Sequence, residues 1–334
     1  MLQIDNQTPF YAVLSVLPNR DAIDTLYVIL KATLVLRPKL TLAREQLPVT
    51  LADEYYGDPT DSSLRATSEI HIGKPGTDVL LVGRAWGPQG QAIREAFVRV
   101  MVGERQKTIR VLGDRVWQSD GTPSVPQPFE AMPLVWERAF GGVHPLEDRT
   151  LAEERNPIGA GFAGKRSTEE LTGQPLPNLE SPGEPLERQG QSLTPVCFAA
   201  TAPQWLPRRA FAGTYDEVWQ RKRAPYLPTD FDPRFLQCAA PELTFDRYLL
   251  GGEPVEVTGA SPEGPIAFPI PAANLRVEVK VAGGVEQPAV NLETVLLEPD
   301  ENRVALTWRA ALPCDRKVLK VEKVTVTRQR AGGG

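Results

Sequence analysis

The sequence predicts a mainly β protein with antiparallel, sandwich-like sheets, a long ordered irregular insert and a few short helices. Two observations support this fold class. The 334 residues include 32 prolines. Proline therefore makes up about 10% of the chain, twice its usual share of ~5%. Because a proline inside a helix costs about 3 kcal/mol, extensive helix is excluded. Both ends of the chain also alternate apolar and polar residues with a period of two, which is typical of half-buried strands.

The N-terminal region, residues 1–117, is predicted to form a β-sheet. Apolar residues at every second position give one face of a long strand: Leu26, Val28, Leu30, Ala32, Leu34 and Leu36. The runs 79–82, 97–102 and 109–112 continue a meander. Connections this short favour antiparallel neighbours over parallel strands joined by crossover helices.

The middle region, residues 118–250, is predicted to be an irregular Pro/Gly-rich insert. Residues 118–210 contain 13 prolines and 9 glycines and show few clean periods. Bulky side chains embedded in this stretch argue for order: Phe129, Trp136, Phe140, Phe162, Phe198 and Trp205. We therefore expect the insert to pack across the sheets.

Two short helices are expected near the end of this insert. One spans 215–222, with Thr214 as N-cap and Glu217 completing a capping box. The other spans 233–238, with Asp232 as N-cap and Pro233 in the first helical position.

The C-terminal region, residues 251–330, is predicted to be antiparallel β. Apolar residues at 275–281 and 304–308 alternate with polar ones, so Arg303, Thr307 and Arg309 are expected in water. Further strands are expected at 255–257, 266–268 and 324–326. A phase slip between Val321 and Val324 predicts a bulge. We expect the three regions to form one compact unit.

Composition and charge narrow the function classes. There are 37 Lys and Arg against 42 Asp and Glu, for a net charge of -5, which argues against binding nucleic acid or an anionic membrane. No basic and apolar leader is present at the N-terminus, and the most apolar stretch, 25–36, is too short to span a bilayer. Three scattered cysteines fit a reducing compartment and simple packing. We expect a cytoplasmic protein.

Motifs with a chemical interpretation are weak. Residues 159–166 match a glycine-rich phosphate loop in part, but no strand precedes them and Arg166 replaces the required hydroxyl, so we interpret a glycine-rich turn. Asp230 and Asp232 resemble a metal-holding carboxylate pair, although capping explains Asp232. His71 and His144 lie in no known catalytic motif.

Polar, aromatic and glycine-rich clusters in irregular segments stand out instead. In such loops Arg and Asp often satisfy buried backbone groups. The functional alternative is a recognition surface, because Trp, Tyr and Arg anchor protein interfaces. The clusters follow one another along the chain: Ala52-Asp-Glu-Tyr-Tyr-Gly-Asp-Pro59 with Ser62-Ser-Leu-Arg65, Lys74-Pro-Gly-Thr-Asp78, Gly113-Asp-Arg-Val-Trp117, Trp136-Glu-Arg-Ala-Phe-Gly-Gly142, Arg155-Asn-Pro157, Leu176-Pro-Asn-Leu-Glu180, Gly213-Thr-Tyr-Asp216, Asp230-Phe-Asp232 and Trp308-Arg-Ala310.

This ordered series resembles the domain-of-unknown-function 2169 family of bacterial type VI secretion clusters, over nearly the whole chain. The resemblance implies a cytosolic adaptor or chaperone rather than an enzyme. It implies as partners a secreted effector, a PAAR-type tip protein and the valine-glycine-repeat spike onto which the effector is loaded. It carries over no catalytic, cofactor-binding or metal-binding residue.

The middle insert is the predicted partner-binding surface. The residues assigned to it are Trp136, Glu137, Arg138, Phe140, Arg155, Asn156, Trp205, Tyr215 and Asp216. Two alternatives remain open. One is a hydrolase or carbohydrate-active enzyme on a β-sandwich, using Asp230, Asp232, His71 or His144. The other is a structural component of the secretion apparatus.

Overall fold

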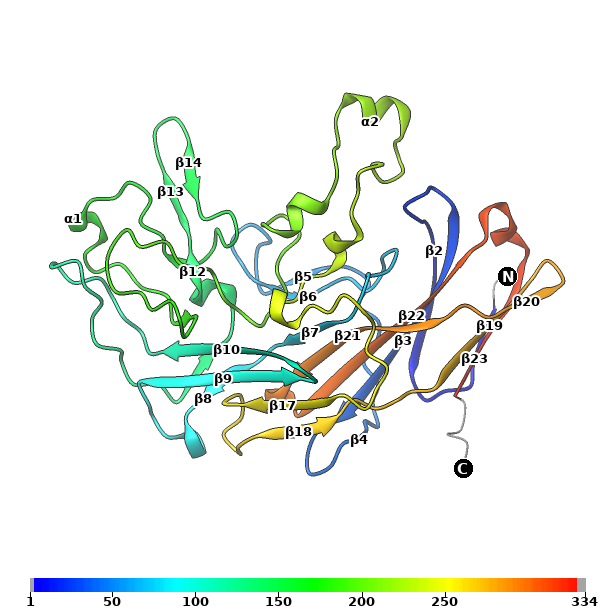
Figure 1. Ribbon diagram of the computed structural model, residues 1–334, viewed down its shortest axis with the longest axis horizontal. Coiled ribbons are helices and arrows are strands. Elements are labelled where there is room, and N and C mark those ends of the chain that lie inside the picture. Colours follow the sequence, from blue (N-terminus) through cyan, green and yellow to red (C-terminus); the bar gives the residue numbers. More distant parts are fainter. Residues whose placement is uncertain (1–2, 329–334) are drawn as a thin grey trace.

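One central six-stranded sheet organises the molecule. A computed structural model describes residues 3–328. The central sheet has the order β2 (Tyr11–Pro18), β3 (Asp24–Val35), β22 (Arg303–Pro313), β21 (Val290–Glu298) and β7 (Asp78–Leu81), with β4 (Thr41–Leu42) also paired to β3. Strands from both ends of the chain therefore lie side by side in one sheet, because residues 25–35 of β3 pair with residues 303–313 of β22 (Figure 1).

Two further sheets complete the main layers. The five-stranded sheet contains β16 (Leu179–Glu180), β10 (Arg105–Leu112), β9 (Glu95–Val102), β17 (Pro254–Thr258) and β18 (Ile266–Pro269), in that order. The four-stranded sheet contains β1 (Gln3–Asn6), β23 (Val321–Arg328), β19 (Leu275–Val281) and β20 (Gly284–Glu286). Their inward side chains and one face of the central sheet form a single large apolar core.

The remaining strands form short two-stranded pairs. They are β8 (Arg84–Trp86) with β11 (Ala131–Pro133), β5 (Glu54–Tyr55) with β6 (Leu64–Ala66), β12 (Phe140–Gly141) with β15 (Ala160–Gly161), and β13 (Val143–Pro145) with β14 (Thr150–Ala152). Most pairs throughout the molecule are antiparallel. The parallel exceptions are β1–β23, β7–β21 and β12–β15.

Helices are few and short. The α-helices are α1 (Thr168–Leu171) and α2 (Glu217–Lys222). Short 3₁₀ helices are η1 (Pro88–Gly90), η2 (Trp136–Arg138), η3 (Arg208–Phe211), η4 (Pro233–Leu236), η5 (Pro241–Leu243), η6 (Pro299–Glu301) and η7 (Asp315–Lys320). With 38% strand and 11% helix, the predicted mainly β class is confirmed. Within residues 3–328, no helix has the length and apolar character needed to cross a bilayer.

Several local predictions can be compared with the structure. The strands expected at 255–257, 266–268, 275–281 and 304–308 are present. The bulge is confirmed, since Lys280 pairs with Lys323 while Val281 pairs with Val321. The long strand around Leu30 is also confirmed. The region boundaries at 117/118 and 250/251 stay a prediction, although sheets are shared across them.

Both predicted helical segments are present and one cap is reassigned, but the second is a 3₁₀ helix that ends at Leu236 instead of Cys238. Asp232 caps η4 by accepting the Arg234 N–H, as expected. The first helix is shorter than predicted, and its N-cap is Asp216, whose carboxylate accepts the Trp219 N–H at 2.7 Å. Thr214 instead donates its hydroxyl to Asp230.

Burial in the core predicts that alanine substitutions at two leucines will lower the free energy of unfolding by very different amounts. Leu30 lies at the centre of β3 and is 0% exposed, whereas Leu319 is 91% exposed. Leu30→Ala should lower the free energy of unfolding by about 2–5 kcal/mol, because it leaves a cavity. Leu319→Ala, the matched control, should change it by less than about 0.5 kcal/mol. Urea unfolding followed by circular dichroism measures both, and equal losses would contradict the layer assignment.

Candidate functional site

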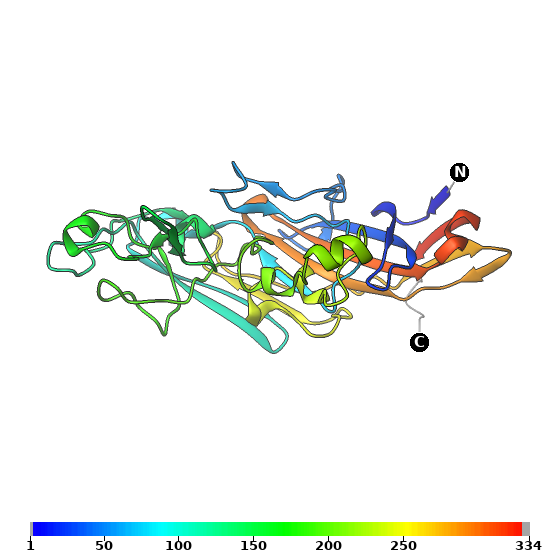
Figure 2. The ribbon, with the colours of Figure 1, turned by 90° about the horizontal axis from the view of Figure 1, so that it is seen from above.

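The second face of the central sheet is covered by one long segment, residues 47–74, called here the strap. Figure 2 shows β5 and β6, which belong to the strap, on the side of the central sheet opposite the five-stranded sheet. Val49, Ile70 and Ile72 of the strap pack against Tyr27 and Ile29 of β3. The strap therefore closes a face that sequence alternation alone leaves open to water.

Charged side chains lie buried between the strap and the sheet. Glu69 is at the centre of the first group: its Oε2 accepts hydrogen bonds from Lys31 Nζ at 2.8 Å and from the Thr50 N–H at 2.7 Å. Its Oε1 accepts the Thr307 hydroxyl at 2.6 Å. Lys31 and Glu69 are only 5% and 8% exposed. One strap carboxylate thus pairs with groups from β3 and β22.

A second group continues across the same face. Arg309 donates from Nε to Glu293 at 2.7 Å and from Nη2 to the backbone carbonyl of Glu69 at 2.7 Å. The other Glu293 oxygen accepts the Lys74 N–H at 2.8 Å. Lys74 Nζ in turn donates to Asp78 of β7 at 2.8 Å. The two groups form one buried ionic network that spans β3, β22, β21 and β7.

His71 lies inside this network. Its Nδ1 faces the N–H of Gly73 at 3.1 Å, and its Nε2 faces Arg309 Nη2 at 3.2 Å. Burial, followed by the positive charges of Arg309 and Lys74, holds the pKa of His71 well below its usual value. The imidazole is therefore neutral at physiological pH and acts as part of the packing between strap and sheet.

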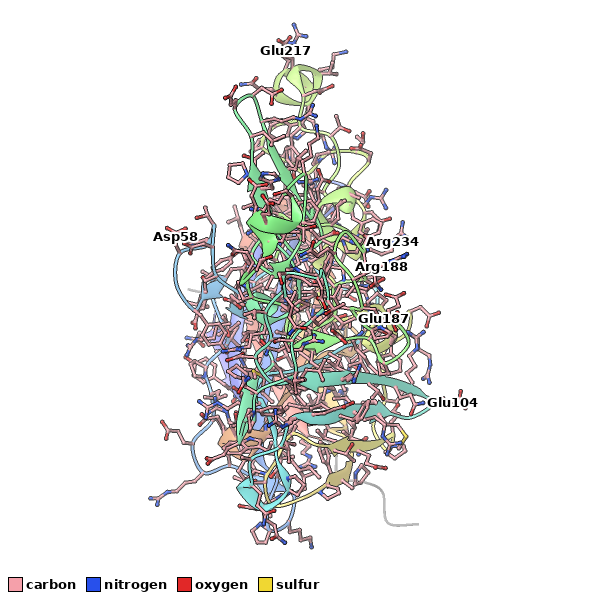
Figure 3. The ribbon with its side chains drawn as sticks, turned by 90° about the vertical axis from the view of Figure 1, so that its left-hand side faces the viewer. Asp58, Glu104, Glu187, Arg188, Glu217 and Arg234 are labelled. Carbon is pink, nitrogen blue, oxygen red and sulfur yellow. The ribbon has the colours of Figure 1, made fainter. Side chains whose placement is uncertain are left out.

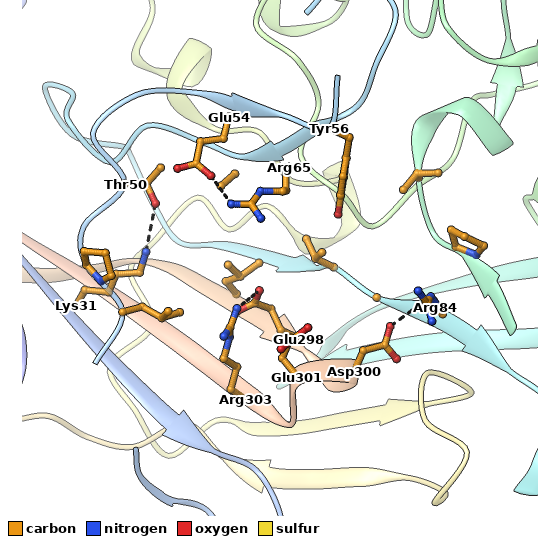
Figure 4. Close-up of a pocket in the computed structure, with 18 residues that line it drawn as sticks. Lys31, Thr50, Glu54, Tyr56, Arg65, Arg84, Glu298, Asp300, Glu301 and Arg303 are labelled. Carbon is orange, nitrogen blue, oxygen red and sulfur yellow. Dashed lines mark hydrogen bonds and ion pairs between the residues drawn. The ribbon is translucent and has the colours of Figure 1, made fainter. Parts of the chain in front are cut away.

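A groove opens at the other end of the strap, between the β5–β6 pair and the sheet (Figure 4). Its volume is about 610 Å³, and four basic and four acidic side chains line it. The lining charges are Lys31, Arg65, Arg84 and Arg303 with Glu54, Glu298, Asp300 and Glu301. Arg65 pairs with Glu54 and Arg303 with Glu298, both at 2.6 Å. Because cations and carboxylates are balanced, the groove does not select a small ligand by the sign of its charge.

The sequence clusters singled out above interlock through hydrogen bonds. Glu137 accepts the Ser63 N–H at 2.7 Å and also the Ser63 hydroxyl, and that hydroxyl accepts the Trp136 N–H at 2.9 Å. The Asn156 side chain donates to the carbonyls of Trp136 and Phe140 at 2.8 and 2.9 Å. These contacts join three distant segments into a landmark cluster that orders the irregular insert.

Close backbone packing explains the glycines beside this cluster. Gly141 has a φ of 155°, and a Cβ there would lie 2.0 Å from the carbonyl oxygen of Asn156. The cluster continues through Arg138, which donates to Asp114 at 2.8 Å and to Asn178 at 2.9 Å. Arg115 pairs with the buried carboxylate of Glu180. The sequence interpretation of these residues as satisfying loop backbone is thus supported by their geometry.

Four residues assigned to the partner-binding surface are not accessible. Trp136, Phe140, Asn156 and Trp205 are 6%, 2%, 0% and 2% exposed. Trp136 and Trp205 pack edge to face, and the Trp136 indole N–H donates to the Ala200 carbonyl. Their placement on an exposed surface is corrected: large apolar rings embedded in a proline-rich insert form its own core.

The other five assigned residues have different surroundings. Glu137, Arg138 and Arg155 are partly buried and hold intramolecular ion pairs or hydrogen bonds, the last with Glu153 at 2.6 Å. Tyr215 and Asp216 are exposed on a projecting segment, residues 212–230, called here the arm. Whether any of these residues binds a partner stays a prediction.

The residues of the enzyme alternative have separate partners. Asp230 accepts the N–H and hydroxyl of Thr214, and these hydrogen bonds lower the pKa of Asp230. Asp232 pairs with Arg234, which lowers the pKa of Asp232. His144 accepts the Lys165 N–H at 2.9 Å and packs against Gly164. Residues 159–166 contain the two-residue strand β15 and the turn that leads from it to the four-residue helix α1. Over residues 3–328, no three His, Cys, Asp or Glu side chains gather as a metal site.

Sequence reasoning missed the buried ionic network. Thr307 and Arg309 were expected in water, but they are 3% and 2% exposed because the strap covers them. One signal was available: Lys31 interrupts the most apolar stretch of the chain. A charge at the centre of a buried strand requires a partner, although the sequence did not identify Glu69 as that partner.

Comparison with known proteins gives one match. A family model described as "Uncharacterized protein conserved in bacteria (DUF2169)" matches residues 21–309. No curated protein and no solved structure matches significantly. The matched range contains the strap, the landmark cluster and the arm.

Breaking the buried ionic network should be costly. Glu69→Gln removes the carboxylate that neutralises Lys31, so the free energy of unfolding should fall by about 3–5 kcal/mol. The matched control is Glu263→Gln, which breaks the Arg37–Glu263 pair at an acid side chain that is 72% exposed. That change should cost less than about 1 kcal/mol. Urea unfolding at pH 7.5 compares the two, and similar small losses would show that the network is not energetically important.

His71 predicts a pH dependence of stability. Its folded pKa is depressed, so protons bind preferentially to the unfolded chain as the pH falls below the ordinary value of 6.5. At pH 5.5 this effect should remove roughly 1.4 kcal/mol relative to neutral pH. His71→Gln should lose correspondingly less stability between pH 7.5 and 5.5. Equal pH slopes for the variant and the wild type, measured by urea unfolding, would contradict the assignment.

Proposed function

Because the chain belongs to the DUF2169 family of bacterial proteins, we propose that it is a non-enzymatic adaptor that binds other proteins. The sequence resemblance supports a specific role: holding a type VI secretion effector, or its PAAR-type tip domain, and helping to load it onto the valine-glycine-repeat spike. The proposed site of action is the cytoplasm, before secretion.

The single observation that carries this proposal is the exposed aromatic and apolar surface of the arm. The arm projects from the same side of the molecule as the β13–β14 pair but well apart from it (Figure 1), and Glu217 lies at its outer end (Figure 3). Tyr215, Val218 and Tyr226 are 53%, 51% and 39% exposed. Large side chains of this kind, displayed away from the protein surface, are the usual anchors of protein interfaces.

The arm is held in shape by its own hydrogen bonds. The Asp230 carboxylate joins the two ends of the arm through Thr214, at 3.0 and 2.7 Å. Inside it, the Trp219 indole N–H donates to the Tyr226 carbonyl at 2.8 Å, and the Tyr215 ring packs 4.7 Å from that of Trp219. Order before binding reduces the entropy lost when a partner docks, which favours a recognition role.

The arm is also joined to the body of the protein. Arg223 donates to the Leu227 carbonyl within the arm and to the Arg20 carbonyl in the β2–β3 turn, at 2.9 and 2.7 Å. The α2 surface carries both signs of charge, since Glu217, Arg221 and Lys222 are all exposed. A partner is therefore expected to meet the arm mainly through apolar contact, with charges at the rim.

Substitutions on the arm test the proposal. The double change Tyr215→Ala with Val218→Ala should weaken binding to the effector or tip protein by at least about tenfold, because two exposed anchors are removed. Isothermal titration calorimetry with purified effectors from the same genome measures the loss. Circular dichroism and thermal unfolding check that the variant remains folded.

A matched control separates the arm from the groove. Tyr56→Ala removes a groove residue that is 52% exposed, almost as much as Tyr215. The Tyr56→Ala variant should bind the effector or tip protein as tightly as the wild type does. If Tyr56→Ala weakens binding and the arm variant does not, the arm is not the contact. Secretion assays separate an adaptor from a structural component: the arm variant should lose one effector's delivery and leave secretion of the others intact.

A further inference from the structure

The outer edge of the central sheet is open along β2. This strand is the last in the sheet on its side and pairs only with β3 (Figure 1). Its register with β3 runs without interruption from Tyr11 opposite Lys31 to Pro18 opposite Asp24. The eight residues carry no charge and no bulge, and proline occurs only at the last position. Charges, bulges and prolines within the strand are the features by which edge strands normally avoid pairing with another chain, and β2 lacks them.

The register shows which backbone groups point outward. The Leu36 N–H donates to the Asn302 carbonyl across β22, so even-numbered residues of β3 bond toward β22. Odd-numbered residues of β3 then bond toward β2, as the Asn19 N–H to Ile23 carbonyl bond at the turn confirms. By the alternation of an antiparallel pair, the N–H and C=O groups of Ala12, Leu14 and Val16 face away from β3.

These outward groups have no partner within residues 3–328, where no hydrogen bond joins them to another segment. Of the groups flanking them, only the Pro18 carbonyl has no partner in the described residues. The outward carbonyl of Phe10 accepts a hydrogen bond from the Asn6 side chain at 2.8 Å, and Pro18 has no N–H. The residues with both a free N–H and a free C=O are thus three, and they are centred on Leu14.

Because the free residues are centred on Leu14, the edge can pair with a copy of itself. We propose that the chain forms a homodimer in which β2 pairs antiparallel with β2 of a second copy. With Leu14 opposite Leu14 of the other copy, Ala12 lies opposite Val16. The three residues supply three donors and three acceptors per copy, so two copies form six hydrogen bonds and leave none of these groups unpaired. The two central sheets become one continuous sheet across a two-fold axis.

Side chains agree with this pairing. Tyr11 and Val16 are exposed by 43% and 42%, which is unusual for large hydrophobic groups on a sheet. In the dimer, Tyr11 lies opposite Leu17 of the other copy and Val16 lies opposite Ala12, so both gain apolar neighbours. No like charges meet, because β2 has none. Self-pairing therefore fits the edge without requiring a complementary sequence from another protein.

The interface is small and is proposed independently of the adaptor function. A contact along one strand edge falls in the size class below about 1,200 Å², so we expect a dissociation constant in roughly the micromolar range. Sedimentation equilibrium should show a monomer–dimer equilibrium for the purified full chain. The arm variant of the preceding section should dimerise like the wild type, so each proposal can fail without the other.

Cysteine cross-linking tests the predicted register. Leu14→Cys places two thiols opposite each other at the two-fold axis, so mild oxidation should yield a covalent dimer. Val16→Cys is the matched control: the two introduced thiols lie four residues apart along the strands, about 14 Å, and should not cross-link. The native cysteines are buried and should not interfere. Equal cross-linking at both positions would overturn the register.

A proline on the edge tests the hydrogen bonds. The Val16 N–H faces outward, so Val16→Pro leaves the bonds to β3 intact and removes two of the six intermolecular ones. The dimer should weaken roughly tenfold or more. If this variant fails to fold, the cysteine pair still decides the question. A chain that stays monomeric up to about 200 µM, or that pairs through β2 only with a strand of another protein, overturns the proposal.

Discussion

Charge burial between the strap and the central sheet is the constraint on which the rest of the structure depends. Lys31, Arg309 and Lys74 are at most 5% exposed, and each meets a carboxylate within 2.8 Å. An unpaired charge in such a place is far more expensive than any single apolar contact is favourable. The strap must therefore lie in one register on the sheet. A different register would move Glu69 away from Lys31, and the free-energy cost of the unpaired buried charge excludes it.

This constraint also positions the irregular insert. Ser63 lies in the strap, and its backbone and hydroxyl contact Glu137 and Trp136, so the strap connects the sheet to the landmark cluster. From there, the side chains of Asn156 and Asn178 donate to the backbone carbonyls of Trp136, in η2, and of Leu112, at the end of β10. Buried backbone groups require such partners wherever regular structure is absent. A long proline-rich segment is ordered here by side-chain hydrogen bonds more than by secondary structure.

Internal use of these residues directs attention to what remains outside. Trp136, Trp205 and Asn156 of the insert are buried by internal packing. The arm and the edge of β2, in contrast, expose apolar side chains that lie outside the core. The two features lie close to one another, because Arg223 of the arm bonds to the β2–β3 turn. The arm is a small folded projection that can contact a partner's surface. The edge of β2 has free backbone N–H and C=O groups that can pair with another strand.

The sequence by itself determined the mainly β class, most strand positions, the bulge near Val321 and the Asp232 cap. Each of these depends on neighbours in the chain: a period of two, a proline, or a side chain that reaches two residues ahead. Tertiary structure alone decided the sharing of sheets between the two ends of the chain, the burial of Thr307 and Arg309, and the interior position of Trp136. A period of two reports that a strand has two faces, but a face becomes wet or dry only when another segment does or does not cover it, and that segment, the strap, is more than 200 residues away from β22 in the sequence.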